Sequence, residues 1–372
     1  MNRYSTINMA NKIKILWLAP HFNHYKARFL DKLHQGNKVE LSLLAGNFNT
    51  KKGYADFTTS QFSYPIQFVS TTKKWFGMSW TVLLKIFSWN RRENFDWIMV
   101  PCEVKNIPLL CIMAFMRIFN QYRIFSYNHA SVGPDKKYYF ISKMMYALCD
   151  RVIFYTEQER NLALQKNLLS NQKAYFANNT LDNNEIRKYY SFEIKSQENP
   201  AILFIGRLIP NKRIWLLIQY YKIIKELISN LHLLIIGDGP DMPIVKAAAE
   251  VDNRIEYFGA LSDEAEISKQ MKRSDLVFNA GLSGLSVNHA FMYGKPYLTC
   301  ANSPHAPEVW YLKDGENGLM LSGTDMKGDC ARIVKLLNDR ISYKNYCINA
   351  FETAQKYSVQ AWVEEMSECL KK

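Results

Sequence analysis

Short apolar runs rich in β-branched residues alternate with longer helix-periodic segments through most of this chain of 372 residues. Such runs predict buried strands, and crossover helices between them indicate a parallel sheet that is covered on both faces. The strands predicted in the first half are Ile13–Leu18, Val39–Leu44, Ile66–Val69, Trp97–Pro101, Arg123–Tyr127, Arg151–Phe154 and Ala174–Ala177. The helices expected between them include Tyr25–Leu33, Ile107–Ile118, Tyr138–Leu148 and Glu157–Lys166.

The same pattern starts again at Ala201, after a polar stretch from Asp182 to Pro200 that we interpret as a linker. The predicted strands are Ala201–Ile205, Leu231–Ile236, Ile255–Phe258, Leu276–Asn279, Pro296–Leu298 and Gly318–Leu321, and the helices are Ile214–Ile228, Met242–Val251, Glu264–Met271 and Leu285–Tyr293. This length suits two domains with full cores. We therefore expect an α/β protein with two doubly wound, Rossmann-like domains that face a central cleft at the carboxyl ends of their strands. The expected domains are residues 1–190 and 191–350, with a C-terminal helix over 351–372 that packs back toward the N-terminal domain.

The net positive charge of the chain is confined to its first half. Residues 1–200 hold 27 basic and 14 acidic side chains, whereas residues 201–372 hold 20 of each. No apolar run approaches the length of about 18–20 residues that a membrane span needs, and no secretory signal is visible. The seven cysteines include no CxxC pair, which argues against a disulfide framework or a zinc site and fits a reducing cytoplasm.

A basic loop follows the first strand of the second half. The strand ends at Gly206, and Arg207 and Lys212 come before the next helix. Glycine lets a ligand approach the backbone, free N–H groups start the helix, and two cations can neutralise a diphosphate. Taken alone, the segment could equally be a basic surface loop.

Further motifs follow in a characteristic order: Gly237-Asp238-Gly239-Pro240, Ser283-Gly284-Leu285-Ser286, Gly294-Lys295-Pro296, Pro307-Glu308-Val309 and Asp314-Gly315-Glu316-Asn317-Gly318. Their order and spacing resemble the donor-binding domain of family 4 retaining glycosyltransferases of the GT-B fold, of the bacterial surface-polysaccharide type. The resemblance is strong over about residues 201–339 and weaker over the first half.

The resemblance implies roles for individual residues. Arg207 and Lys212 would contact the donor diphosphate and stabilise the departing nucleotide, as fixed cations do for developing charge. No Asp-x-Asp motif occurs in a suitable place, so no metal is expected to do this. His129 would lie beside the transferred sugar, and it completes the expected catalytic set. The residues expected to bind the donor are Gly206, Gly237, Asp238, Gly239, Gly281, Leu282, Ser283, Gly284, Leu285, Ser286, His289, His305 and Glu308.

The sequence departs from the family at its paired glutamates, which are normally separated by seven residues. Gly281 stands at the first position and His289 at the second. We expect the His289 imidazole to bond a ribose hydroxyl, and His305 and Glu308 to hold hydroxyls of the sugar. The alternatives are a degenerate, inactive site and an ordinary surface histidine at position 305.

In the first half, the resemblance places His21, His24 and Arg28 at the border of the cleft, where they would meet the acceptor. Two histidines at this spacing also suggest a metal site, but no partner carboxylate or cysteine supports one. Glu103 would touch the acceptor, or it would cap the helix that starts near Asn106.

Residues 73–92 combine basic and aromatic side chains. Trp80, Leu83, Leu84 and Phe87 share one helix face, and lysines and arginines flank both ends. The segment is either a core helix with basic ends or an interfacial element that meets an anionic membrane surface. No nucleic-acid motif accompanies the charge, so no nucleic-acid partner is expected.

The sequence therefore predicts a retaining hexosyltransferase that works without a metal. Its donor would be a UDP-sugar first and a GDP-sugar next. Its acceptor would be a surface glycan such as a capsule or O-antigen, carried on a polyprenyl diphosphate. The expected location is cytoplasmic, peripheral on the inner face of the cell membrane. Transfer to a soluble acceptor, a nucleotide-sugar epimerase of the same fold and a non-catalytic sugar-binding subunit are the alternatives.

Overall fold

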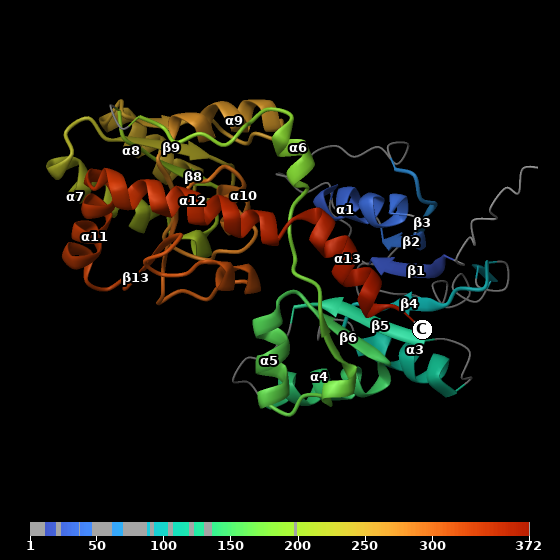
Figure 1. Ribbon diagram of the computed structural model, residues 1–372. Coiled ribbons are helices and arrows are strands. Elements are labelled where there is room, and N and C mark those ends of the chain that lie inside the picture. The colour runs from blue at the N-terminus through green and yellow to red at the C-terminus, as the bar shows by residue number, and fades with distance from the viewer. Residues whose placement is uncertain are drawn as a thin grey trace, which may run out of the picture. The chain divides into compact units, whose positions relative to one another are not determined.

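The computed structural model describes residues 12–19, 24–36, 38–46, 62–69, 88–89, 93–102, 107–118, 123–129, 136–196 and 199–371. These residues divide into two compact units (Figure 1). The described residues up to Asn178, together with those after Trp362, form the N-terminal unit, and those from Asn179 to Trp362 form the C-terminal unit.

The N-terminal unit is built on a seven-stranded sheet with the order β3-β2-β1-β4-β5-β6-β7, in which every paired strand is parallel to its neighbour. Its strands are β1 (Ile13–Ala19), β2 (Val39–Gly46), β3 (Ile66–Val69), β4 (Trp97–Met99), β5 (Arg123–Asn128), β6 (Arg151–Phe154) and β7 (Ala174–Phe176). Its helices include α1 (His24–Gln35), α3 (Ile107–Ile118), α4 (Lys136–Leu148) and α5 (Glu157–Gln165).

The C-terminal unit has a six-stranded parallel sheet with the order β10-β9-β8-β11-β12-β13. Its strands are β8 (Ala201–Ile205), β9 (His232–Ile236), β10 (Ile255–Tyr257), β11 (Leu276–Asn279), β12 (Tyr297–Cys300) and β13 (Gly318–Leu321). Its helices are α6 (Asn183–Arg187), α7 (Ile214–Leu227), α8 (Met242–Val251), α9 (Glu264–Arg273), α10 (Ser286–Met292), α11 (Met326–Asn338) and α12 (Arg340–Lys356). The strand order reverses between β8 and β11, and such a switch point opens a crevice at the carboxyl ends of the strands.

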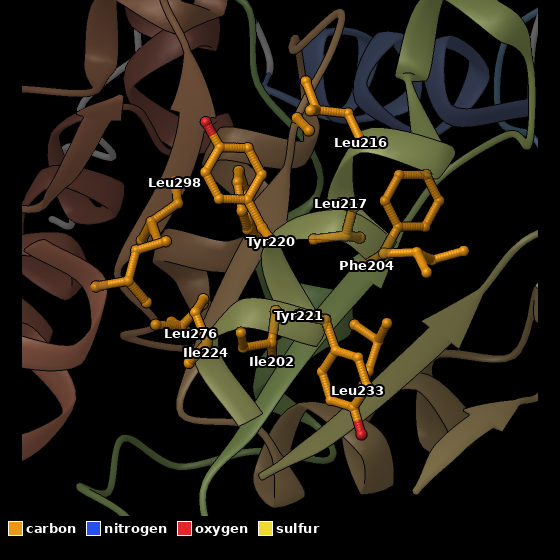
Figure 2. Close-up of a cluster of buried hydrophobic side chains, with 14 of the residues drawn as sticks. Ile202, Phe204, Leu216, Leu217, Tyr220, Tyr221, Ile224, Leu233, Leu276 and Leu298 are labelled. Carbon is orange, nitrogen blue, oxygen red and sulfur yellow. The ribbon is translucent and has the colours of Figure 1, made fainter. Parts of the chain in front are cut away.

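Both faces of the C-terminal sheet are buried. Alternate residues of each strand point to opposite sides, and both sets lie in hydrophobic clusters. Ile202 and Phe204 of β8 pack in one hydrophobic cluster, and Leu203 packs in another. Figure 2 shows the first cluster, in which Tyr220 and Tyr221 of α7 lie over the strands. This double burial explains why the strands are continuous apolar runs.

The predicted α/β class with two doubly wound sheets is confirmed, and each strand predicted above has a counterpart in one of the two sheets. The predicted linker differs, because it contains the short helix α6. Helix α11 lies in a stretch for which the hydrophobic pattern of the sequence predicted neither a helix nor a strand.

The C-terminal region contains two helices, α12 and α13 (Val359–Cys369). Helix α12 packs on α10 within the C-terminal unit. The end of α13 is bound within the N-terminal unit, where the Trp97 Nε1–H donates to the Leu370 carbonyl over 3.1 Å. The Glu365 carboxylate likewise accepts from the Asn178 backbone over 2.6 Å.

None of the helices in the described part of the chain is long and apolar enough to cross a membrane. The six cysteines whose side chains are described are buried and not joined in disulfides.

Candidate functional site

Two glycine-containing loops meet at the carboxyl edge of the C-terminal sheet, one after β8 and one after the neighbouring strand β9. The Gly206 backbone N–H donates to the Ile236 carbonyl over 3.0 Å, and Leu208 donates to the Asp238 carbonyl over 2.9 Å. A β-carbon on Gly237 would lie 1.8 Å from the Gly206 carbonyl oxygen, and Gly237 has a positive φ of 148°. Glycine at this position is therefore required both by the conformation and by the close approach of the two backbones.

Lys212 places its ammonium group near Gly206, at the paired loops after β8 and β9. Its Nζ lies 3.9 Å from where Gly206 would carry a β-carbon, and it donates to the Leu282 carbonyl oxygen. Burial, the largest cause, and the neighbouring Arg207 charge together lower the pKa of Lys212 to about 8, against the opposing effect of Glu308, which raises it. Burial and a second cation both disfavour the charged form, so an anion bound here would relieve this cost. Arg207 itself is exposed.

The loop after β11 lies directly against the loop that carries Lys212. The Leu282 N–H donates to the Asn211 carbonyl over 2.7 Å. A β-carbon on Gly281 would lie 2.2 Å from the Asn211 carbonyl oxygen and 2.6 Å from the Lys212 carbonyl carbon. The glutamate expected at this position in the family therefore has no space in this chain.

The loop after β12 is hydrogen-bonded to the loop after β11. The Ala306 N–H donates to the Ser283 carbonyl over 2.8 Å, and the Ser283 N–H donates to His305 Nδ1 over 3.1 Å. His305 Nε2 lies 3.0 Å from the Cys300 carbonyl, to which it must donate. Both ring nitrogens are thus used within the protein, and burial lowers the pKa of His305. In this structure His305 therefore fixes the loop, and its contact with sugar hydroxyls stays a prediction.

Glu308 is buried at the start of the turn Pro307–Tyr311, and its carboxylate accepts from the Asn179 side-chain amide. Its Oε2 lies 3.4 Å from the point where Gly284 would carry a β-carbon. A negative charge therefore lies close to the loop that also receives the Lys212 ammonium. The Glu308 charge also raises the pKa of Lys212, and the contact of Glu308 with sugar hydroxyls stays a prediction.

Hydrogen bonds between hydroxyl groups support the loop after β11. Ser283 Oγ lies 2.8 Å from Thr299 Oγ1 and 3.0 Å from the Tyr297 hydroxyl, and Ser286 Oγ lies 2.7 Å from the same tyrosine oxygen. Leu285 forms the N-cap of α10. The predicted donor residues from Gly281 to Ser286 thus lie in one hydrogen-bonded loop that runs into α10. Sequence spacing alone gave no indication of Tyr297 and Thr299 as its supports.

Beside β9, Asp238 turns its carboxylate back to the Gly239 N–H, with a distance of 2.7 Å. Gly239 also approaches the first loop, since a β-carbon on it would lie 2.3 Å from the Leu208 carbonyl oxygen. The structure therefore brings the loop that holds the predicted Gly206 and Arg207 against the predicted residues 237–239.

His289, on the first turns of α10, pairs with a residue that the sequence analysis did not select. Its Nε2 lies 2.9 Å from Glu264 Oε1 at the start of α9. The Tyr293 hydroxyl donates to the same oxygen over 2.6 Å. Glu264 is 25 residues from His289 in the chain, so no local spacing signals this contact.

In the N-terminal unit, His129 follows β5 and lies 3.1 Å, through Nδ1, from Glu159 Oε1. The His129 side chain is 60% exposed, whereas the Glu159 side chain is 5% exposed. A buried carboxylate thus orients an exposed imidazole, an arrangement that suits hydrogen bonding to a substrate. Thr156 caps the first turn of α5 and so positions Glu159.

The remaining residues predicted to meet the acceptor are only partly covered by the structure. Arg28 is exposed on α1. His24 begins α1, but its side chain lies outside the described residues, as do His21 and Glu103.

Residues 199–339 match the family Glycosyl transferases group 1. No curated protein matches the chain. Among solved structures, HepE from Anabaena, determined with UDP, is 15% identical with a TM-score of 0.71, covering 97% of this chain and 99% of that one. The sucrose-phosphate synthase of Thermosynechococcus elongatus is 13% identical with a TM-score of 0.72, covering 96% and 98%. A glycosyltransferase of Rickettsia africae is 13% identical with a TM-score of 0.73, covering 97% and 100%.

The two parallel sheets and these structural similarities define the GT-B class of fold. Residues 199–339 form a group 1 glycosyltransferase domain, and the chain is a glycosyltransferase.

Proposed function

We propose that this protein transfers a hexose from a UDP-sugar to a surface-glycan acceptor carried on a polyprenyl diphosphate, with retention of the anomeric configuration. In the transfer step, the acceptor hydroxyl oxygen forms a bond to the anomeric carbon while the bond from that carbon to the diphosphate oxygen breaks. The acceptor proton passes to the departing diphosphate. The protein then contributes positioning and charge stabilisation.

The observation that carries this proposal is the half-buried Lys212 ammonium group above the Gly206 loop. It is the group best placed to meet a diphosphate that approaches the glycine backbone, and Arg207 adds a second cation beside it. The proposal assigns the neutralisation of the leaving group to these two side chains and not to a metal ion. Structurally similar HepE was determined with UDP and with UDP-glucose, which favours uridine as the base.

Thermal unfolding with a panel of nucleotides tests the donor. A ligand at about 100 times its dissociation constant adds about 2.7 kcal/mol to the free energy of unfolding. We expect UDP and UDP-glucose to raise the Tm, and GDP and dTDP to raise it less. Incubation of labelled UDP-sugar with membrane extract should then give a labelled lipid-linked product, with or without EDTA. Release of free epimerised hexose would indicate an epimerase, and tight UDP binding without turnover would indicate a binding subunit.

Exposed apolar side chains on α3 and α4 support a membrane-bound acceptor. Phe115 and Ile118 of α3 and Phe140 and Met144 of α4 are exposed, and the two helices pack on each other. Arg117 and Lys143 are exposed on the same helices. Apolar side chains among basic ones fit the interface of an anionic membrane. The predicted segment 73–92 lies outside the described residues except for Ser88 and Trp89, and Trp89 is buried.

We expect the protein to sediment with vesicles that contain phosphatidylglycerol, and less with phosphatidylcholine alone. The double change Ile118→Ser/Phe140→Ser should weaken this binding by at least about tenfold, because about 0.8 kcal/mol is lost for each CH₂ no longer buried in lipid and two such groups already have that effect. Val251, 89% exposed on α8, offers a matched control in Val251→Ser. Equal binding to neutral and anionic vesicles would contradict the assignment to an anionic surface, and binding to neither would contradict membrane association.

A further inference from the structure

Arg213 adopts a backbone conformation that residues with a β-carbon rarely accept. Its φ of 51° and ψ of 46° lie in the left-handed region. Among the residues that the structure describes, the other non-glycine residues with a positive φ are Asn94 and Asn167, and asparagine tolerates this region better than most residues do. An arginine is disfavoured there by about 5- to 30-fold, so other contacts must hold it.

This conformation forms the joint between helix α7 and the turn that carries Lys212. The Arg213 N–H donates to the Pro210 carbonyl over 3.0 Å and closes the turn Pro210–Lys212. The Arg213 carbonyl accepts from the Leu216 N–H over 2.9 Å and starts α7. A change of φ at Arg213 therefore changes the direction in which the turn leaves the helix. Lys212, the residue directly before Arg213, would move with the turn.

The side chain of Arg213 is bound at two points to one residue of the loop after β12. Its Nη1 donates to Asn302 Oδ1 over 2.8 Å, and its Nη2 donates to the Asn302 carbonyl over 3.0 Å. Two donors on one planar guanidinium fix the direction of the side chain as well as the place of its end. The contact with Asn302 therefore restricts the backbone of Arg213.

Asn302 is itself held by the loop after β13. Its Nδ2 donates to the Gly323 carbonyl over 2.9 Å, and the Gly323 N–H donates to the buried Asp329 carboxylate over 2.9 Å. The hydroxyl of Tyr220, on α7, donates to the same carboxylate oxygen over 2.6 Å. These hydrogen bonds return to the helix that Arg213 begins, so Asn302 offers a fixed support.

We propose that Arg213 is a positioning residue for Lys212: its contact with Asn302 holds the left-handed joint, and the joint keeps the Lys212 ammonium group at the Leu282 carbonyl. The inference rests on the proposed function, in which Lys212 neutralises the leaving diphosphate. Arg213 then acts through the backbone, and its own charge is not required.

Two replacements of Arg213 separate backbone conformation from charge. Arg213→Lys keeps the positive charge but cannot reproduce the two-point contact. The joint then loses its support, and kcat should fall by about 5- to 30-fold. Arg213→Gly removes the charge, but glycine adopts a positive φ readily, so its kcat should be about 3- to 10-fold above that of Arg213→Lys. Initial rates with labelled UDP-glucose measure both.

Asn302 allows a double-mutant cycle. Asn302→Ala should lower kcat about as much as Arg213→Lys, but it should have little further effect in the Arg213→Gly background, where no side chain needs support. Asn302→Ala also serves as the milder variant if Arg213→Lys does not fold, and the Tm of each variant shows this. Asn338→Ala, exposed at the end of α11, is the matched control and should keep the full rate.

The pH dependence of UDP affinity gives a readout that a loss of fold stability alone would not move. Burial, with the Arg207 charge, lowers the pKa of Lys212 to about 8. If the joint relaxes and the ammonium group moves toward solvent, this pKa rises. The fall in affinity should then shift to higher pH in Arg213→Lys and Asn302→Ala, and less in Arg213→Gly. Glu308 and His305, which also face Lys212, are the same in all of these variants.

The inference requires that Arg213→Gly be clearly faster than Arg213→Lys. Equal rates, or a faster Arg213→Lys, would overturn it, because the charge or the side chain itself would then serve the reaction. An unshifted pH profile in both Arg213→Lys and Asn302→Ala would overturn it as well. If Lys212→Ala slows transfer in either case, the proposed function stands. If Lys212→Ala leaves transfer unchanged, the proposed role of Lys212 and this inference both fail.

Discussion

Replacement of Lys212 by alanine is expected to lower the rate of sugar transfer by about 10²- to 10³-fold, the usual effect of removing one group that stabilises developing negative charge. The reason lies in its position, because its ammonium group is half-buried above the Gly206 loop and bonded to the Leu282 carbonyl. Charge on a departing diphosphate increases in the transition state, so the loss should appear mainly in kcat. Initial rates with labelled donor would measure it.

Lys222, exposed on α7, is the matched control, and Lys222→Ala should keep the full rate. Arg207→Ala should have a smaller effect than Lys212→Ala, since Arg207 is exposed and screened by solvent. Unchanged transfer by Lys212→Ala would show that the diphosphate binds elsewhere.

The same lysine predicts how donor affinity depends on pH. Burial and the Arg207 charge lower the pKa of Lys212 to about 8. Below that pH the side chain is a cation, and above it the free enzyme loses the charge. A nucleotide phosphate with its second pKa near about 6 stays ionised throughout. Affinity for UDP should therefore fall as the pH rises through about 8. Lys212→Arg keeps its charge and should bind with little change from pH 7 to 9, and a falling profile in that variant would assign the titration to another group.

Replacement of Gly281 by glutamate, the residue that the resembling family carries at this position, is expected to destabilise the protein and to weaken nucleotide binding. The first side-chain atom would lie 2.2 Å from the Asn211 carbonyl oxygen, and both neighbours are backbone. Relief of this overlap must move the loop that carries Lys212. We expect Gly281→Glu to lower the free energy of unfolding by about 1–3 kcal/mol, and to weaken UDP binding by at least about tenfold. Denaturant unfolding and nucleotide titration would measure the two effects.

The variant Gly281→Ala tests the steric effect of a side chain at this position without adding a charge. It should destabilise the protein nearly as much as Gly281→Glu, because the overlap begins at the β-carbon. Higher donor affinity in Gly281→Glu would refute the steric explanation and indicate that an acid is missing from the site.

The predicted strands and most of the predicted helices could be found from the sequence because the signal for each is local. Leu233, Leu234, Ile235 and Ile236 are all buried, and a run of this kind indicates a strand with helices on both sides. The glycines before Arg207 and around Asp238 likewise mark the ends of strands. The missed helix α11 contains Lys327, Gly328 and Asp329 within its first turns, and these residues weaken the apolar period there.

The candidate site was only partly predictable. Its basic pair and glycine loops lie in continuous segments, so their order indicated them. The partner of His289 was missed because Glu264 comes from another helix. The bonds of His305 to the Ser283 N–H and the Cys300 carbonyl were missed as well, because the Ser283 N–H lies 22 residues away in the chain. A histidine offers the same two nitrogens to a ligand or to the protein, and residue type does not distinguish these uses.

Local sequence was sufficient to predict the two doubly wound sheets, the basic character of residues 1–200 and the positions of Arg207 and Lys212, because each depends on neighbours in the chain. The folded chain was needed to show that Gly281 has no room for an acid, that His305 supports a loop, and that His289 pairs with Glu264. Each of these depends on distances of a few ångströms between segments far apart in sequence. Hydrogen bonding and steric overlap act only over such distances, so only the folded chain fixes them.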